Sequence, residues 1–261
     1  MQMMKITLCF FLLSWSAFGQ DMSLYQKREF KMSDNKILPY RILFPENYDR
    51  IKKYPLVLFL HGVGERGNDN EKQLTHGAKL FLLPESRKNF PSIVVFPQCA
   101  ADGYWSSVKI DVNKKPIEFD FDYNRPSTDQ LDGVVKMLKR VIRTESVDKK
   151  RVYISGLSMG GFGTFEIVSR FPKLFAAVLP ICGGGDAKHY NKKVKTVPFW
   201  IFHGADDAVV NVNYSREMAE KLKLMGVTVR YSEYPGVNHN SWNNAFAESD
   251  FLSWMFSNKR K

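Results

Sequence analysis

An α/β fold, with a mostly parallel, doubly wound sheet flanked by helices, is predicted by three observations. Continuous apolar runs such as Leu56-Val57-Leu58-Phe59-Leu60 have the composition of strands buried on both faces. Amphipathic segments of helical period separate these runs along the chain. Glycine-rich turns follow several of the runs. A sheet built from such alternating units binds its ligands at the carboxyl ends of its strands.

The first elements differ from the rest. Leu24–Met32 and Leu38–Phe44 alternate apolar and polar residues, and the turn-forming residues Ser33-Asp34-Asn35 join them. We expect two leading antiparallel strands.

Strands and helices then alternate to the end of the chain. The predicted strands are Leu56–Leu60, Ile93–Phe96, Val152–Ile154, Ala176–Ile181, Val197–Phe202 and Thr228–Tyr234. The predicted helices are Thr128–Arg143, capped by Ser127 or Thr128, Met159–Arg170, which stops before Pro172, Asn213–Leu224, ended by Gly226, and Trp242–Phe256.

A long connection between Phe96 and Thr128 carries an additional pattern. Residues 108–112 and 117–123 alternate apolar and polar side chains on both sides of a short polar turn, which predicts a β-hairpin over 108–123. A hairpin that only covers the core fits this pattern as well as a functional one. We expect Trp105 and the hairpin to form one wall of the acyl or leaving-group pocket, and Trp242 to contribute to the other.

The N-terminal residues have the pattern of an export signal. Lys5 precedes the apolar stretch Ile6–Trp15, and Ala17-Phe18-Gly19 forms a small-x-small cleavage site. We therefore expect a signal peptide over 1–19 and one catalytic domain over 20–261 in a secreted or periplasmic protein, with a retained anchor as the alternative. The apolar stretch is too short to span a bilayer, and we expect no stable membrane insertion after cleavage of the signal peptide.

The net charge of +11 does not indicate a nucleic-acid partner. The basic residues lie in short scattered runs, such as Lys149-Lys150-Arg151, without an aromatic-rich single-strand motif or a recognition helix. A solvated basic surface is the simpler interpretation.

Two cysteines, Cys99 and Cys182, remain after the expected cleavage. In the usual strand order of such a sheet, two strands lie between the strands that precede them. That separation exceeds the reach of a disulfide, so we expect two buried free thiols.

A serine turn carries the chemistry. Gly156-Leu157-Ser158-Met159-Gly160-Gly161 directly follows the strand Val152–Ile154 and opens the helix Met159–Arg170. The glycines leave room where the strand and helix backbones nearly touch, and the sharp turn exposes the serine hydroxyl. This pattern predicts Ser158 as a catalytic nucleophile.

A serine nucleophile requires a histidine that takes its proton and a carboxylate that fixes the tautomer of that histidine. His239 follows the acidic candidates and lies between the last strand and the last helix. Asp206 and Asp207 both follow the strand Val197–Phe202. We favour Asp207, because related hydrolases carry the acid before a small residue or proline and two apolar residues, as in Ala208-Val209-Val210. Asp206 would then stabilise the turn.

The order serine, aspartate, histidine is that of the α/β-hydrolase fold. Its oxyanion hole combines the N–H of the residue after the nucleophile, here Met159, with one from the loop after the strand Leu56–Leu60. We expect the second donor to be Val63, with Gly62 or Gly64 as alternatives. His61 and His203, each before a glycine at a strand end, are expected to be structural. No cluster has the spacing of a zinc site, so no metal is expected.

These motifs, together with Glu65-Arg66-Gly67, Pro97-Gln98-Cys99, Pro180-Ile181-Cys182-Gly183-Gly184 and Asn238-His239, resemble secreted bacterial esterases related to feruloyl esterases, acetyl-xylan esterases and polyhydroxybutyrate depolymerases. The chain is also similar to phospholipase/carboxylesterases and predicted peptidases. The resemblance covers nearly all of the chain after residue 19 and implies an ester hydrolase that needs no cofactor.

We therefore expect a secreted serine carboxylic-ester hydrolase that forms an acyl-enzyme, acting on a small-molecule or polysaccharide ester such as an acyl or feruloyl ester of plant polysaccharide. The alternatives are a serine peptidase of the prolyl oligopeptidase type, a lipid or polyester carboxylesterase, and a binding module that has lost catalysis. The sequence leaves the acyl group, the alcohol and the oligomeric state open.

Overall fold

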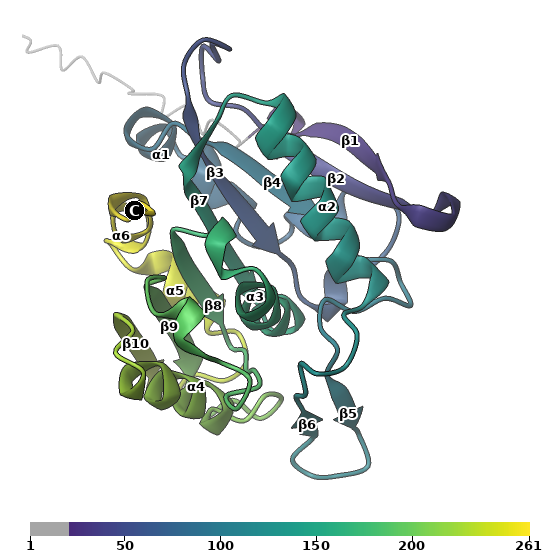
Figure 1. Cartoon of the computed structure of the whole chain (residues 1–261), viewed down its shortest axis with the longest axis vertical. Helices are drawn as coiled ribbons and strands as arrows, with labels where there is room; N and C mark the ends of the chain where they lie inside the picture. The colour runs from purple at the N-terminus through teal and green to yellow at the C-terminus, as the bar shows by residue number, and fades with distance from the viewer. Residues whose placement is uncertain (1–20) are drawn as a thin grey trace, which may run out of the picture.

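The computed structural model describes residues 21–261. The expected signal peptide over 1–19 lies outside the described residues. A single eight-stranded sheet crosses the molecule in the order β1-β2-β4-β3-β7-β8-β9-β10 (Figure 1). Its strands are β1 Gln26–Lys31, β2 Ile37–Leu43, β3 Tyr54–Leu60, β4 Ile93–Pro97, β7 Val147–Leu157, β8 Ala177–Ile181, β9 Phe199–Gly204 and β10 Val229–Tyr234.

The sheet is antiparallel at one edge and parallel elsewhere. β2 pairs antiparallel with both β1 and β4, whereas the pairs from β4 to β10 are parallel. This is the mostly parallel α/β architecture that the sequence predicts. β7 is longer than predicted because Tyr54 pairs with Val147, and a register shift then brings Leu56 opposite Val152. The polar residues between Val147 and Val152 interrupt the apolar pattern, so the sequence does not predict this extension.

Helices cover both faces of the sheet. They are α1 Pro84–Asn89, α2 Asp129–Thr144, α3 Met159–Arg170, α4 Asn213–Leu224, α5 Trp242–Ala247 and α6 Phe251–Ser257. In β3, Leu56, Leu58 and Leu60 pack in a core with α2, α3 and α4. Val57 and Phe59 pack in a second core with α5, α6 and the segment before α1. The continuous apolar run of β3 therefore reflects burial on both faces.

The predicted final helix Trp242–Phe256 is wrong, because the chain forms two helices there, α5 and α6. Glu248 leaves the helical conformation with ψ of 120°, and its side chain accepts a hydrogen bond from Tyr234. The break lets Phe251 pack against Phe202 and Phe246. The periodicity of the sequence does not predict this tertiary contact, because the apolar pattern continues across the break.

The predicted hairpin is present as a separate two-stranded sheet, β5 Lys109–Asp111 and β6 Glu118–Asp120. Ile110 pairs with Phe119, so these apolar residues share a face as expected. The hairpin projects beyond the body of the molecule beside the end of α3 (Figure 1). Phe119 and Phe121, near its base, pack against Phe162 of α3.

Cys99 and Cys182 are buried and free, as predicted. They follow β4 and β8, and β3 and β7 lie between those strands. Within residues 21–261, no helix combines the length and the apolar character that a membrane span requires.

Candidate active site

Ser158 occupies the sharp turn between β7 and α3. Its φ of 54° is in the left-handed region, which is unusual for a residue other than glycine and marks local strain. The turn is fixed by a hydrogen bond from Ser158 N to Ile181 O of β8. The side chain lies at the carboxyl end of the central strand, where the sequence places it.

The glycines after Ser158 are required by close backbone contacts. A Cβ at Gly160 would lie 2.0 Å from Leu60 O, and a Cβ at Gly161 would lie 2.7 Å from Ile181 O. α3 can therefore begin directly over β3 and β8 only when these positions lack side chains.

The structure brings together the three residues predicted as a triad. His239 Nε2 lies 2.9 Å from Ser158 Oγ, and His239 Nδ1 lies 2.8 Å from Asp207 Oδ2. The carboxylate is fully buried, whereas 21% of the His239 side chain is exposed. This geometry permits proton transfer from serine to histidine while the carboxylate orients the ring.

Asp207 is held in place as an anion. Its Oδ1 accepts hydrogen bonds from Val209 N and Val210 N. Burial by itself would raise the pKa of Asp207, but hydrogen bonds from His203 and His239 and the charge of His239 outweigh it and hold that pKa well below its usual range. Asp206 is exposed, and its backbone N–H donates to Val237 O.

The two predicted oxyanion donors, Val63 and Met159, are each the first residue of a helical turn. The first N–H groups of such a turn lack partners within it. The Val63 loop lies against the serine turn, since a Cβ at Gly62 would lie 2.8 Å from Leu157 Cδ1.

Hydrogen bonds hold the loop that carries Val63 on both sides. Arg66 donates to Val63 O and to Gly103 O. His61 Nδ1 lies 2.6 Å from Gly62 O, and Cys99 N donates to His61 Nε2. Burial lowers the pKa of His61 to about 4, which agrees with a neutral structural histidine, as predicted. The anchoring role of Arg66 was not anticipated.

Trp242 lies beside the histidine of the candidate triad. Its ring centre is 5.6 Å from that of His239 and 5.0 Å from that of His76. A hollow of about 340 Å³ opens here between α5 and residues 75–83. Its lining is mostly apolar and includes Leu80, Leu83, Trp242 and Phe246.

Trp105 does not form a pocket wall as expected. It has no exposed surface and packs under His61, with ring centres 5.3 Å apart. The two residues after it, Ser106 and Ser107, bind the buried carboxylate of Glu166 on α3. These contacts draw the indole into the core.

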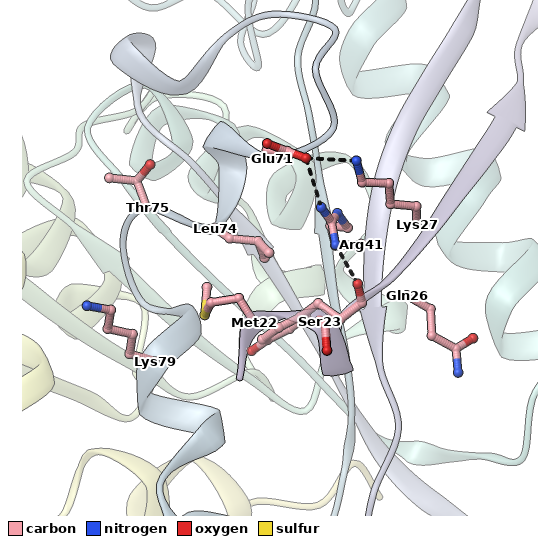
Figure 2. Close-up of a pocket in the computed structure, with 10 residues that line it drawn as sticks. Met22, Ser23, Gln26, Lys27, Arg41, Glu71, Leu74, Thr75 and Lys79 are labelled. Carbon is pink, nitrogen blue, oxygen red and sulfur yellow. Dashed lines mark hydrogen bonds and ion pairs between the residues drawn. The ribbon is translucent and has the colours of Figure 1, made fainter. Parts of the chain in front are cut away.

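A larger hollow lies elsewhere. It has a volume of about 690 Å³ and is bounded by the start of the described chain, β2 and residues 71–79 (Figure 2). Lys27 and Arg41 meet Glu71 at one end, and Lys79 lies at the other (Figure 2). Neither the predicted triad nor Val63 or Met159 lines it.

The described part of the chain has one group of side chains whose atoms lie close enough together to hold a metal ion. Cys182, Asp207 and His239 offer ligand atoms within 4.8 Å of one another. Asp207 and His239 already share a hydrogen bond, and burial raises the pKa of the Cys182 thiol. The raised pKa keeps the Cys182 thiol protonated, and Asp207 is already engaged by His239, so the group favours proton transfer over metal binding.

Comparisons with known proteins identify the family. A family model described as phospholipase/carboxylesterase matches residues 48–254. The carboxylesterase SOBER1 of Arabidopsis thaliana is 27% identical over 190 residues, which cover 70% of this chain and 82% of that protein.

Two solved structures extend the comparison. A thermostable esterase is similar with a TM-score of 0.81 and 36% identity, over 91% of this chain and 64% of the esterase chain. This chain therefore spans about two thirds of the length of that esterase. A ferulic acid esterase of Anaeromyces mucronatus has the same fold, with a TM-score of 0.65 at 19% identity, over 89% of this chain and 90% of the other.

Proposed function

The chain belongs to the phospholipase/carboxylesterase family of α/β-hydrolases, and we propose that it hydrolyses carboxylic esters through an acyl-enzyme on Ser158. The observation that carries the proposal is the continuous hydrogen-bonded path from Ser158 Oγ through His239 to Asp207.

The reaction follows from these positions. His239 takes the proton of Ser158 as Oγ attacks the ester carbonyl, and Asp207 stabilises the imidazolium that forms. The amides of Val63 and Met159 hold the oxyanion. His239 then gives its proton to the leaving alcohol, and a water molecule that it activates releases the acyl group and regenerates Ser158.

We propose that the hollow beside Trp242 receives an apolar part of the substrate. Its mostly apolar lining and a rigid aromatic ring next to His239 suit an aryl or acyl group. A feruloyl or acyl ester of plant polysaccharide meets this requirement. A lipid or polyester would present the same apolar group, so a substrate screen must separate these classes.

The experiment compares purified wild-type protein with the Ser158→Ala variant on nitrophenyl esters of increasing length, methyl ferulate and acetylated xylan. We expect hydrolysis by the wild type and a loss of about 10⁴-fold or more in the variant. Equal activity of the two proteins would refute the proposal. Cleavage of peptide amides but not esters would favour the peptidase alternative.

We also propose that residues 1–19 direct export. The basic start, the apolar stretch and Ala17-Phe18-Gly19 support this. Mass spectrometry of the exported protein should show a chain that begins near Gln20. A secreted chain that retains Met1 would contradict it.

A further inference from the structure

A second histidine contacts the acid of the candidate triad. His203 precedes Gly204 at the end of β9 and is fully buried. Its Nε2 lies 3.2 Å from Asp207 Oδ2 and 2.9 Å from Val210 O. Asp207 Oδ2 is thus approached by both His203 and His239.

The hydrogen-bond partners of His203 determine which of its ring nitrogens carry a hydrogen. Val210 O and the Asp207 carboxylate can only accept, so Nε2 must carry a hydrogen. On the other side, Nδ1 lies 2.7 Å from Ser215 Oγ, which in turn lies 2.8 Å from Gly183 O.

Ser215 has a single hydroxyl hydrogen, and Gly183 O can only accept. If that hydrogen goes to Gly183 O, Nδ1 must donate to Ser215 Oγ. If it goes to Nδ1, a buried carbonyl and a buried hydroxyl face each other at 2.8 Å without a hydrogen between them, which is unfavourable. The complete network therefore has hydrogens on both ring nitrogens of His203.

His61 provides an internal contrast. It is also a buried histidine before a glycine at a strand end. Its Nδ1 meets a carbonyl, but its Nε2 accepts the Cys99 N–H, so a single neutral tautomer satisfies both partners. The chain thus places two similar histidines in environments that demand different protonation.

The groups around His203 can balance a positive charge. Asp207 faces it directly, and His239 and the Cys182 thiol also lie close to that carboxylate. On the neighbouring strand β10, Glu233 pairs in register with His203, and its carboxylate is bound by Arg216.

We propose that His203 is a positioning residue, protonated at both ring nitrogens, that holds Asp207 Oδ2 in place for His239. This inference rests on the proposed function. During the reaction Asp207 then lies between two imidazolium rings. The fixed charge of His203 repels the positive charge that forms on His239 during the reaction.

The test replaces His203 with glutamine, which retains a donor near the position of Nε2 but removes the charge. We expect kcat to fall about tenfold with KM within about twofold, because the substitution disturbs the orientation of the base and leaves the residues around the proposed substrate hollow unchanged. Without the nearby positive charge, His239 binds a proton more readily. The acidic limb of kcat/KM should therefore move to higher pH by about 0.5 unit or more.

Trp200→Phe is the matched control. Trp200 lies on the same strand, is fully buried and donates to Ser232 Oγ. Its loss should lower the Tm without moving the acidic limb. An unmoved limb in His203→Gln, or an equal shift in Trp200→Phe, would overturn the proposal.

A second measurement needs no activity. The ¹⁵N resonances of the His203 ring in the wild-type protein should show both nitrogens bonded to hydrogen from pH 6 to 8. A ring nitrogen without hydrogen would overturn the proposal even if the protein is an esterase, and protonated nitrogens would support the charged state even if no ester is cleaved.

Discussion

Asp207 Oδ2 lies 2.8 Å from His239 Nδ1, whereas the adjacent Asp206 is exposed and makes no side-chain bond to that histidine. Two adjacent residues in the turn after β9 therefore differ. The Asp207 carboxylate can fix the tautomer of His239, whereas the Asp206 carboxylate faces solvent.

This difference predicts unequal effects of two similar substitutions. Asp207→Asn should lower kcat about 10³-fold or more, because an amide nitrogen at this position favours the wrong tautomer of His239. Asp206→Asn should lower it less than tenfold. Steady-state kinetics on one nitrophenyl ester checks both, and reversed magnitudes would move the acid to Asp206.

Trp242 predicts a change in substrate ranking. Trp242→Leu should alter the ratio of kcat/KM for aryl and acetyl esters by about tenfold, roughly 1.4 kcal/mol, because the ring lines the hollow and its centre lies 5.6 Å from that of His239. The control is Trp254→Leu. Trp254 lies on α6, and its ring packs against Trp200 of β9. If both variants keep the wild-type ratio, the acyl group binds elsewhere.

The hairpin allows a separate test of the other expected wall. Shortening residues 109–120 to a Gly/Ser turn leaves the predicted triad unchanged. If Phe119 and its neighbours border the substrate, the same aryl-to-acetyl ratio should change by more than about tenfold. If the shortened protein folds and keeps the original ratio, the hairpin only covers Phe162 and does not border the substrate.

His61 predicts how stability depends on pH. Its folded pKa of about 4 lies below the usual value of 6.5, so the unfolded chain binds the proton first as the pH falls. The neutral ring therefore stabilises the fold above pH 6.5, and this contribution decreases between pH 6.5 and 4, in total by about 3 kcal/mol.

Thermal unfolding of wild-type and His61→Gln proteins measures this effect. The wild-type Tm should fall more steeply than that of the variant between pH 6.5 and 4.5, where most carboxylates remain ionised. Parallel curves would show that His61 does not resist protonation.

Local patterns were sufficient to predict most of the fold. The apolar runs of β3 and β8 indicate burial, and the glycines around Ser158 indicate close backbone contact, so each feature leaves a recognisable pattern within a few consecutive residues. The break between α5 and α6 depends instead on where Phe251 packs, and the apolar pattern shows no interruption there.

The candidate site divides in the same way. Ser158, Asp207 and His239 could be predicted because each follows a strand and the chemistry restricts the residue types. The sequence predicts Trp105 in a pocket wall, yet Glu166 binds the next two residues and the indole is buried in the core. The contact of His203 with Asp207 could not be predicted, since it depends on Ser215 and Gly183 from other elements.

The central claim is that Ser158 forms a covalent acyl-enzyme, and intact-protein mass spectrometry tests it most directly. A phosphonate ester that mimics the tetrahedral intermediate should add one equivalent to the wild-type protein, located on Ser158 by peptide mapping. The Ser158→Ala variant should stay unmodified. Stoichiometric labelling of that variant, or labelling of the wild type at another residue, would contradict the claim.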